Sequence, residues 1–262
     1  MFLVSQNVIY AFYATLFTWG ITALGASIVF FFKTIHPKLM AFIFGFGAGV
    51  MIAASFFSLI LPGINLSKEL GQIDFLVASL GFLFGGLFIY LIDLLITHNE
   101  KKKDVNKTTF KNKLLLIIAI TLHNIPEGMA IGVAFGAASL GLGGSTLLEA
   151  FLLAIGIGLQ NFPEGIAVSL PLRSEGMSRK KSFFYGQLSG LVEPFSALIG
   201  VSLVLLIRGI LPFILCFAAG SMIYVVAEEL IPSAKLNAKE KTGTFGVICG
   251  FVIMMILDIA LG

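Results

Sequence analysis

Long, nearly uncharged apolar stretches run through the whole of this chain and limit what it can fold into. Eight such stretches occur, each about as long as the ~20-residue helix that crosses a bilayer core of roughly 30 Å. Only 12% of the 262 residues are charged, against about 25% in soluble domains. The sequence therefore predicts an all-α integral membrane protein, a single polytopic membrane domain over 1–262 with eight transmembrane helices. The predicted spans are 8–32, 38–61, 73–97, 113–138, 146–171, 182–207, 209–231 and 243–261.

Basic residues gather on alternate connections between these spans. Fifteen of the 17 Lys and Arg residues fall on the first, third, fifth and seventh connections, and only Lys68 and Arg208 fall on the others. Because cytoplasmic loops collect Lys and Arg, we expect both termini outside and the polar loop 98–112 in the cytoplasm. We expect a multi-pass protein of the cell membrane, in a bacterium the inner membrane. The net charge of +3 is too small to indicate nucleic acid as a partner.

Two copies of one polar motif interrupt the fourth and fifth spans. The fourth span carries LHNIPEGMAIG and the fifth carries LQNFPEGIAVS. The polar positions within each copy are three or four residues apart, so they share one helix face. They are His123, Asn124 and Glu127 in the first copy, and Gln160, Asn161 and Glu164 in the second.

Each motif also contains a proline and a glycine that alter the helix around the carboxylate. Pro126 and Pro163 each free a backbone carbonyl four residues earlier, which membrane helices tolerate only against protein or a polar cavity. Gly128 and Gly165 follow the glutamates and permit close approach of a neighbouring backbone. We therefore expect both motifs to face the interior of the helix bundle.

A third carboxylate, Glu193, lies in the middle of the sixth span. Glu127, Glu164 and Glu193 are 14, 9 and 12 residues from the nearest basic residue at the cytoplasmic edge of their spans. At about 1.5 Å per residue, these separations correspond to depths of roughly 21, 13 and 18 Å. Three carboxylates and a histidine are thus predicted to converge near the centre of the membrane.

Ionisable groups at this depth need a reason, because burying one costs roughly 2.5–3.5 kcal/mol on insertion scales. No Lys or Arg lies within the central spans to pair with the carboxylates. Three interpretations compete: interhelical hydrogen bonding, a proton relay, and a metal site. Carboxylates that repel one another recruit a cation, so we favour the metal site. Imidazole with carboxylates suits Zn²⁺, Fe²⁺ and Mn²⁺, and both zinc and iron fit these ligands.

These motifs resemble those of the ZIP (Zrt- and Irt-like) family of divalent metal transporters, in particular its bacterial GufA-like branch. The resemblance rests on HNIPEG in one helix and a second PEG motif in the next, and it covers nearly the whole chain. It implies transport of divalent metal ions, most often zinc taken up toward the cytoplasm by alternating access. It also implies two inverted three-helix repeats around a central helix pair, with spans one, four, five and six moving against the others.

The resemblance implies a two-metal centre in which Glu127 and Glu164 bridge the ions. Met51 matches a position that supplies a thioether in similar bacterial proteins, although a methionine there is ordinarily a core residue. The implied ligands are His123, Asn124, Glu127, Gln160, Asn161, Glu164, Glu193 and Met51. The glycine pairs Gly45 and Gly49, Gly81 and Gly85, and Gly246 and Gly250 fit a closely packed scaffold.

Two departures from the family pattern affect these expectations. Asn161 stands where several relatives have an acidic ligand, so three carboxylates would balance one Zn²⁺ to −1 and two Zn²⁺ to +1. We expect one ion to bind tightly and the second weakly. The loop 98–112 holds only His98, so we do not expect it to sense metal. Asp93, Glu228 and Glu229, near the cytoplasmic ends of their spans, form either a metal exit site or ion pairs with loop lysines.

The competing class is a membrane-embedded metalloenzyme, which needs an open coordination position and a base aimed at bound water. No HExxH motif occurs, and GQLSG at 186–190 has the wrong spacing for a nucleophile elbow. We therefore expect a transporter and no organic cofactor. The expected cargo is zinc, with cadmium, iron or manganese as alternatives. The lipid bilayer is the expected surrounding, and the family resemblance implies a homodimer.

Overall fold

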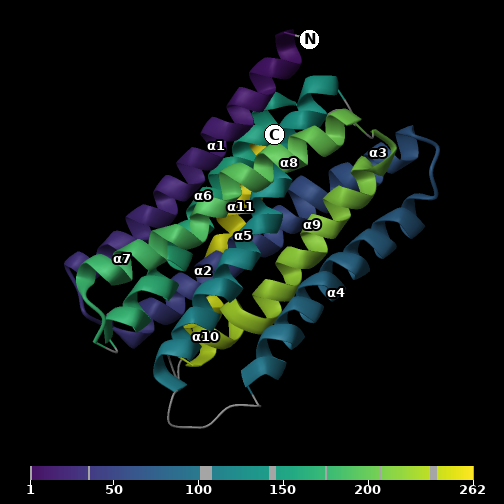
Figure 1. Cartoon of the computed structure of the whole chain (residues 1–262). Coiled ribbons are helices and arrows are strands. Elements are labelled where there is room, and N and C mark those ends of the chain that lie inside the picture. Colours follow the sequence, from purple (N-terminus) through teal and green to yellow (C-terminus); the bar gives the residue numbers. More distant parts are fainter. Residues whose placement is uncertain are drawn as a thin grey trace.

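The structure is a computed structural model of the chain, and it is a bundle of long helices (Figure 1). It describes the backbone of residues 2–34, 36–100, 108–141, 146–174, 176–206, 208–236 and 241–261. It describes their side chains except at 2–5, 96–100, 108–120, 122, 123, 205, 206, 208, 236 and 261. Within the described backbone all regular structure is helical, which confirms the predicted all-α class.

The helices coincide with the apolar stretches, although several are built from stacked pieces. Seven of them are long and apolar enough to cross a membrane, judged on the described residues alone. The remaining predicted span, 113–138, lies within the 33-residue helix α5. In chain order the elements are α1 (Phe2–Ala26), η1 (Ser27–Phe30), α2 (Pro37–Ala54), η2 (Ser55–Ile60), α3 (Leu61–Glu69), α4 (Asp74–Glu100), α5 (Thr108–Leu140), α6 (Leu147–Ser174), α7 (Arg179–Leu188), η5 (Ser189–Leu191), α8 (Val192–Leu206), η6 (Arg208–Ile210), α9 (Leu211–Val225), η7 (Val226–Leu230), α10 (Ile231–Leu236) and α11 (Thr242–Leu261).

Four helix pairs have the most extensive packing of the structure. Helix α1 packs along α6, α5 along α8, α2 along α11, and α4 along α9. The first two pairs form one group, since α1 also contacts α5 and α8, and α5 contacts α6. Contacts of α2 with α6 and of α5 with α9 join this group to the other four helices. The start of α1 and the end of α11 lie at one end of the bundle, and α7 and α10 lie at the other (Figure 1).

Glycines line the contacts between the helices of the other four, where α4 packs along α9 and α2 packs along α11. A Cβ on Gly85 would lie 1.9 Å from the carbonyl oxygen of Phe217, and one on Gly49 would lie 2.0 Å from that of Val247. From the side of α11, a Cβ on Gly250 would lie 2.0 Å from the backbone oxygen of Phe46 on α2. Only glycine permits such backbone contact. The expected role of the glycine pairs is therefore confirmed.

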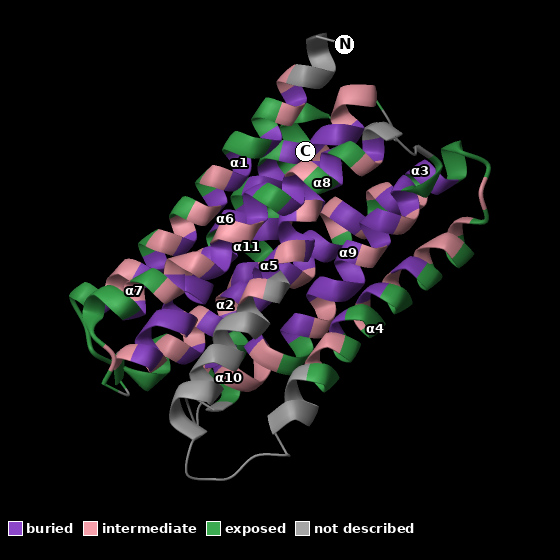
Figure 2. Ribbon diagram, viewed as in Figure 1, coloured by how far each residue is buried: buried purple, intermediate pink, exposed green. Residues whose placement is uncertain are grey.

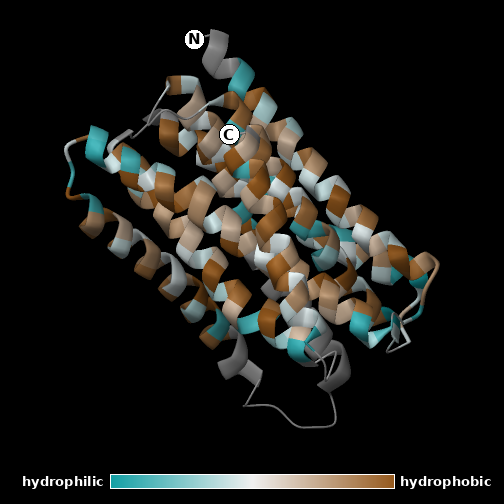
Figure 3. Cartoon of the chain, turned by 180° about the vertical axis from the view of Figure 1, so that it is seen from behind, coloured by the Kyte–Doolittle hydropathy of each residue, from teal (hydrophilic) through white to brown (hydrophobic). Residues whose placement is uncertain are grey.

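The outer surface of the bundle is apolar, and the described polar side chains of the motifs are inside. Buried residues occupy the middle of the bundle, and the exposed ones lie outside (Figure 2). Along the outermost helices α4 and α11 the exposed side chains include Phe75, which is 72% exposed, and Ile259, which is 67% exposed. Seen from behind, hydrophobic residues extend along most of the helix lengths (Figure 3). Such a surface suits contact with lipid rather than water.

Candidate metal site

The polar residues of both motifs whose side chains the structure describes lie inside the bundle with Glu193. Asn124 and Glu127 on α5, Gln160 and Asn161 on α6, and Glu193 at the start of α8 are fully buried, and Glu164 on α6 is 5% exposed. Groups of this kind are almost never buried unless they are paired or bind a ligand. Six polar side chains are therefore buried together in the interior of the bundle.

Hydrogen bonds connect these residues across three helices. The Gln160 Nε2 donates to the Glu127 Oε1 at 2.6 Å, which joins the second motif to the first. Asn161 Nδ2 and Asn124 Nδ2 both donate to the Oε1 of Glu193, at 2.8 Å and 3.0 Å. The two motifs and the third carboxylate, far apart in the sequence, thus form one polar cluster.

The glycine of each motif lets a helix approach closely enough to build this cluster. A Cβ on Gly128 would lie 2.4 Å from the carbonyl oxygen of Glu193, so α8 contacts α5 through the first motif. A Cβ on Gly165 would lie 2.1 Å from the carbonyl oxygen of Thr22, so α1 contacts α6 through the second. Both glycines have the role expected for them.

The three carboxylates lie within range of mutual repulsion. Glu127 interacts unfavourably with Glu164 and Glu193, and Glu164 interacts unfavourably with Glu193. Hydrogen bonds from amides offset part of this cost, but a neutral donor does not cancel a buried charge. A bound cation would remove the repulsion directly.

Five oxygen atoms of the cluster have no hydrogen-bond partner among the residues that the structure describes. A buried acceptor without a partner is rare in a folded protein, and five of them together are unusual. Carboxylate and amide oxygens are ligands that divalent cations accept. The five atoms are Asn124 Oδ1, Glu127 Oε2, Gln160 Oε1, Asn161 Oδ1 and Glu164 Oε2, and all belong to the two motifs.

The carboxylates do not form a compact ligand set by themselves. Among the side chains that the structure describes, no three His, Cys, Asp or Glu residues lie close enough together to hold a metal ion. The side chain of His123, the expected imidazole ligand, lies outside the described residues. The donors that the structure brings together are therefore carboxylates and amides, with Glu193 engaged by the two asparagines.

Met51 is fully buried in the main hydrophobic core. It lies one turn beyond Gly47 on α2, whose position would bring a Cβ to 3.6 Å from the Pro163 side chain of the second motif. Met51 thus lies on a helix that packs against α6 at the motif. Its burial agrees with the core interpretation of this methionine.

The residues considered for an exit site gather around one tyrosine. Tyr224 on α9 donates a hydrogen bond to the Asp93 Oδ2 at 3.1 Å, which joins α9 to α4. Glu229 is close enough to interact unfavourably with Asp93 and Glu228, and also with Glu164 of the polar cluster. Glu229 is therefore within electrostatic range of a carboxylate of the polar cluster as well as of Asp93 and Glu228. The lysines of the loop 101–107 lie outside the described residues.

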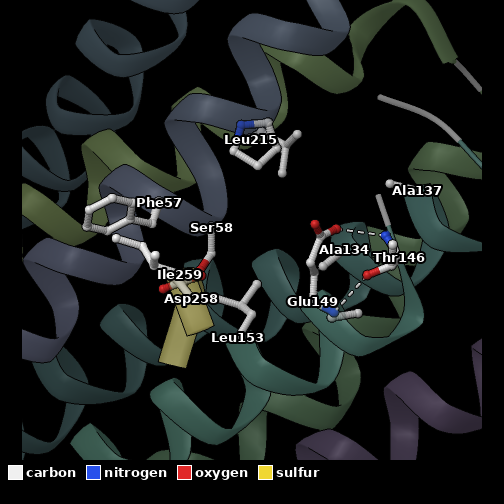
Figure 4. A pocket seen from close by; sticks show the side chains of 12 residues that line it. Phe57, Ser58, Ala134, Ala137, Thr146, Glu149, Leu153, Leu215, Asp258 and Ile259 are labelled. Atoms are coloured by element: carbon white, nitrogen blue, oxygen red, sulfur yellow. Dashed lines mark hydrogen bonds between the residues drawn. The ribbon is translucent and has the colours of Figure 1, made fainter. Parts of the chain in front are cut away.

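A cavity of about 130 Å³ opens near the other end of α6 (Figure 4). Ser58 donates to the Asp258 Oδ1 at 2.7 Å, and the Asp258 Oδ2 has no hydrogen-bond partner in the described part of the chain. Glu149 caps the start of α6 through Thr146. Leu153 lines the cavity, and Gln160 lies about two turns further along α6. The cavity therefore ends outside the polar cluster.

Two residues that contact the acidic side chains were not predicted from the motifs. The Thr18 hydroxyl on α1 donates to the Glu193 Oε2, and Tyr224 contacts Asp93 as described. Thr15, Thr18 and Thr22 are all fully buried and lie three and four residues apart on one face of α1. This spacing of hydroxyls on one face of α1 was the available signal for Thr18. Tyr224 carries no such pattern.

The fold and the cluster define a multi-pass membrane protein with a group of buried polar side chains in its interior. Residues 98–258 match the family model described as ZIP Zinc transporter. The chain belongs to the ZIP family, as its motifs indicate.

The similarity to its relatives extends over most of the chain. It is 37% identical to the zinc transporter ZIP11 of Bos taurus, over 95% of this chain and 96% of the relative. It is 37% identical to the zinc transporter GufA of Myxococcus xanthus, over 95% and 98%. It is 36% identical to the zinc transporter ZIPB of Bordetella bronchiseptica, over 92% and 78%. These relatives are named as transporters rather than enzymes, which is the class expected from the sequence.

Proposed function

We propose that this protein carries divalent metal ions, zinc in the first place, across the cell membrane toward the cytoplasm. The observation that carries the proposal is the group of five unpartnered oxygens among three buried carboxylates. A cation satisfies these oxygens and neutralises the repulsion at once. The names of the relatives support zinc as the cargo. Cadmium, iron and manganese share the ligand chemistry and remain part of the proposal.

The two motifs supply the ligands in this proposal. His123, Asn124 and Glu127 approach the ion from α5, and Gln160, Asn161 and Glu164 approach it from α6. Glu127 and Glu164 bridge when two ions are present, while Glu193 and Met51 complete the ligand set. Asp93, Glu228 and Glu229 receive the ion on its way out, because Glu229 already interacts with Glu164.

Transport by alternating access requires two parts of the protein to move against each other. The packing supports one division, because α1, α5, α6 and α8 contact one another in several combinations while α2 pairs with α11 and α4 with α9. We propose that these two groups are the moving parts. The same proposal places both termini outside, in a bacterial inner membrane, and includes a homodimer.

Zinc uptake into proteoliposomes tests this function. We expect the wild-type protein to raise the internal zinc concentration, and cadmium, iron and manganese to compete according to their affinity. Glu127→Ala should reduce uptake at least a hundredfold, because it removes a carboxylate shared by both ions. Asp74→Asn is the matched control, since Asp74 is a carboxylate outside the cluster that pairs with Lys68 at 3.7 Å. Wild-type transport by Glu127→Ala would contradict the proposal, as would proton flux without metal flux.

A further inference from the structure

Helices α2 and α9 carry two copies of one short sequence. Helix α2 has FGAGVMI at 46–52 and α9 has FAAGSMI at 217–223, so five of the seven residues are identical. The methionine of each copy is buried, Met51 completely and Met222 to 1% exposure. A π-helical segment begins four residues after each methionine, at Ser55 and at Val226. The two helices are therefore copies of one element, and Met222 is the counterpart of Met51.

The glycine of each copy shows which way the methionine is turned. A Cβ on Gly49 would lie 2.0 Å from the carbonyl oxygen of Val247 on α11, and one on Gly220 would lie 2.0 Å from that of Phe82 on α4. Successive residues of a helix are about 100° apart, so the methionine two positions later faces roughly the opposite way. Besides these partner helices, α2 contacts α6 and α9 contacts α5. The two methionines therefore face the helices that carry the polar motifs.

Other residues on the same helix faces support this orientation. Gly47 is one turn from Met51, and its Cβ would lie 3.6 Å from the Pro163 side chain on α6. Leu215 is seven residues, about two turns, before Met222, and it lines the cavity together with residues of α5. Each methionine is thus turned toward one copy of the polar motif.

The two methionines lie toward opposite ends of the bundle. Seven residues beyond Met51, Ser58 lines the cavity near the start of α6. Seven residues beyond Met222, Glu229 precedes α10, which lies at the other end of the bundle (Figure 1), and Glu229 interacts with Glu164. Met51 is therefore on the side of the cavity, and Met222 is on the side of the carboxylates considered for an exit site. An ion that crosses the polar cluster passes both depths.

We propose that Met222 is a second thioether ligand on the path of the ion, which the ion meets between the polar cluster and Glu229. The proposal rests on the proposed function. Inverted repeats exchange their roles when a transporter alternates, so a contact of Met51 with an ion on one side recurs at Met222 for an ion on the other side. A thioether is a soft ligand that favours zinc and cadmium, whereas manganese prefers oxygen. Met222 therefore selects the ion at the cytoplasmic face, as Met51 does at the outer face.

Met222→Leu tests this, because leucine keeps the volume of methionine and removes the sulfur. Transport is measured in inside-out vesicles, whose cytoplasmic face meets the added metal, and in right-side-out vesicles. We expect the KM for cadmium to rise about tenfold at the cytoplasmic face, as for loss of one group that supports metal binding. It should stay near the wild-type value at the outer face, and the KM for manganese should not change at either face. A purely structural defect would change both metals alike.

Two further methionines provide the comparison. Met51→Leu should show the reverse pattern, with a higher KM for cadmium at the outer face only. Met254→Leu is the matched control, because Met254 is equally buried but lies on α11, where its sulfur fills the space beside Gly156 of α6. The KM for cadmium at the cytoplasmic face should not change in this variant.

If Met222→Leu does not insert, Met222→Ile is measured with the same expectation. The inference is overturned, even when the wild-type protein transports zinc, by an unchanged KM for cadmium at the cytoplasmic face. Equal rises for cadmium and manganese, or an equal rise in Met254→Leu, overturn it as well. Absence of wild-type transport overturns the proposed function instead.

Discussion

At the scale of single residues, Asn161 is the point where charge and hydrogen bonding oppose each other. Its amide donates to Glu193 at 2.8 Å, which a carboxylate cannot do. Yet two Zn²⁺ ions bring four positive charges to a site with three glutamates. In a low-dielectric interior the remaining charge opposes the second ion. The neutral amide thus favours the protein structure at the expense of the second metal.

Asn161→Asp should reverse that balance. We expect a lower melting temperature without zinc, because two carboxylates then face each other where an amide donated to Glu193. We expect the second zinc ion to bind at least tenfold more tightly, because four carboxylates neutralise two ions. Uptake should fall as affinity rises, since the ion is released more slowly. Calorimetric titration and thermal unfolding with and without zinc measure these effects.

Asn65→Asp provides the comparison, because Asn65 is exposed on α3 and undergoes the same chemical change away from the cluster. Its zinc affinity and melting temperature should match those of the wild type. If the wild-type protein already binds two ions with equally tight affinity, the charge argument for Asn161 is wrong.

The positions of the cluster residues could be predicted from the sequence, but their hydrogen bonds could not. The helical spacing within each motif places Asn124 with Glu127 and Asn161 with Glu164, whatever the rest of the fold. That Glu193 is turned toward Thr18 depends on how α8 packs against α1, at a separation of 175 residues. Local pattern carries no information on such a contact. The expectation that Glu193 is a metal ligand stays a prediction.

At the scale of helices, apolar length predicted where spans occur but not how they are built. The second and seventh spans each contain a π-helical segment, Ser55–Ile60 and Val226–Leu230. Such segments add a residue to the turn and are common at functional sites. Here one carries Ser58, which binds Asp258, and the other carries Glu228 and Glu229. Neither segment contains a proline or glycine that would have indicated it.

Gly85 tests the glycine seam between α4 and α9. Gly85→Ala should destabilise the protein by roughly 1–3 kcal/mol, because overpacking a tight interface forces the helices apart. The added Cβ would lie 1.9 Å from a backbone oxygen, which cannot move aside as a side chain can. Thermal unfolding in detergent, followed by circular dichroism, measures the loss. The polar cluster is on other helices, so zinc affinity of the folded fraction should be unchanged.

Gly20→Ala serves as its control, because Gly20 is inside α1 with nothing within 4 Å of the added Cβ. Alanine favours a helix over glycine by up to about 1 kcal/mol, so stability should stay the same or rise. Equal damage from both substitutions would show that the loss reflects glycine content rather than the seam.

At the scale of the whole molecule, the helix pairs agree with an inverted repeat. Suppose that spans one, two and three correspond to spans six, seven and eight, and that span four corresponds to span five. Packing between any two spans should then recur between the two corresponding spans. The α1–α6 pair corresponds to α8–α5, and the α2–α11 pair to α9–α4. These are the four principal pairs of the structure. The π-helical segments also fall on corresponding spans, two and seven.

The orientation of the molecule in the membrane is the last prediction. Fifteen of the 17 basic residues fall on one set of connections, so we expect the loop 98–112 inside the cell. Its central part, 101–107, lies outside the described residues. The connection between α3 and α4 belongs to the other set and should face outward. Ile73 in this connection is 58% exposed, so a cysteine there is accessible to a reagent.

Single cysteines at these two positions distinguish the orientations, in a protein whose Cys216 and Cys249 are replaced by serine. In intact cells, a membrane-impermeant thiol reagent should label Ile73→Cys and leave Asp104→Cys unlabelled. Permeabilised cells should label both, which shows that each cysteine is reactive. We expect this pattern because a loop rich in Lys and Arg stays on the cytoplasmic side when the protein inserts into the membrane. The reverse pattern in intact cells would invert the topology and place both termini inside. Labelling of both positions before permeabilisation would place both outside and would require an even number of spans between them.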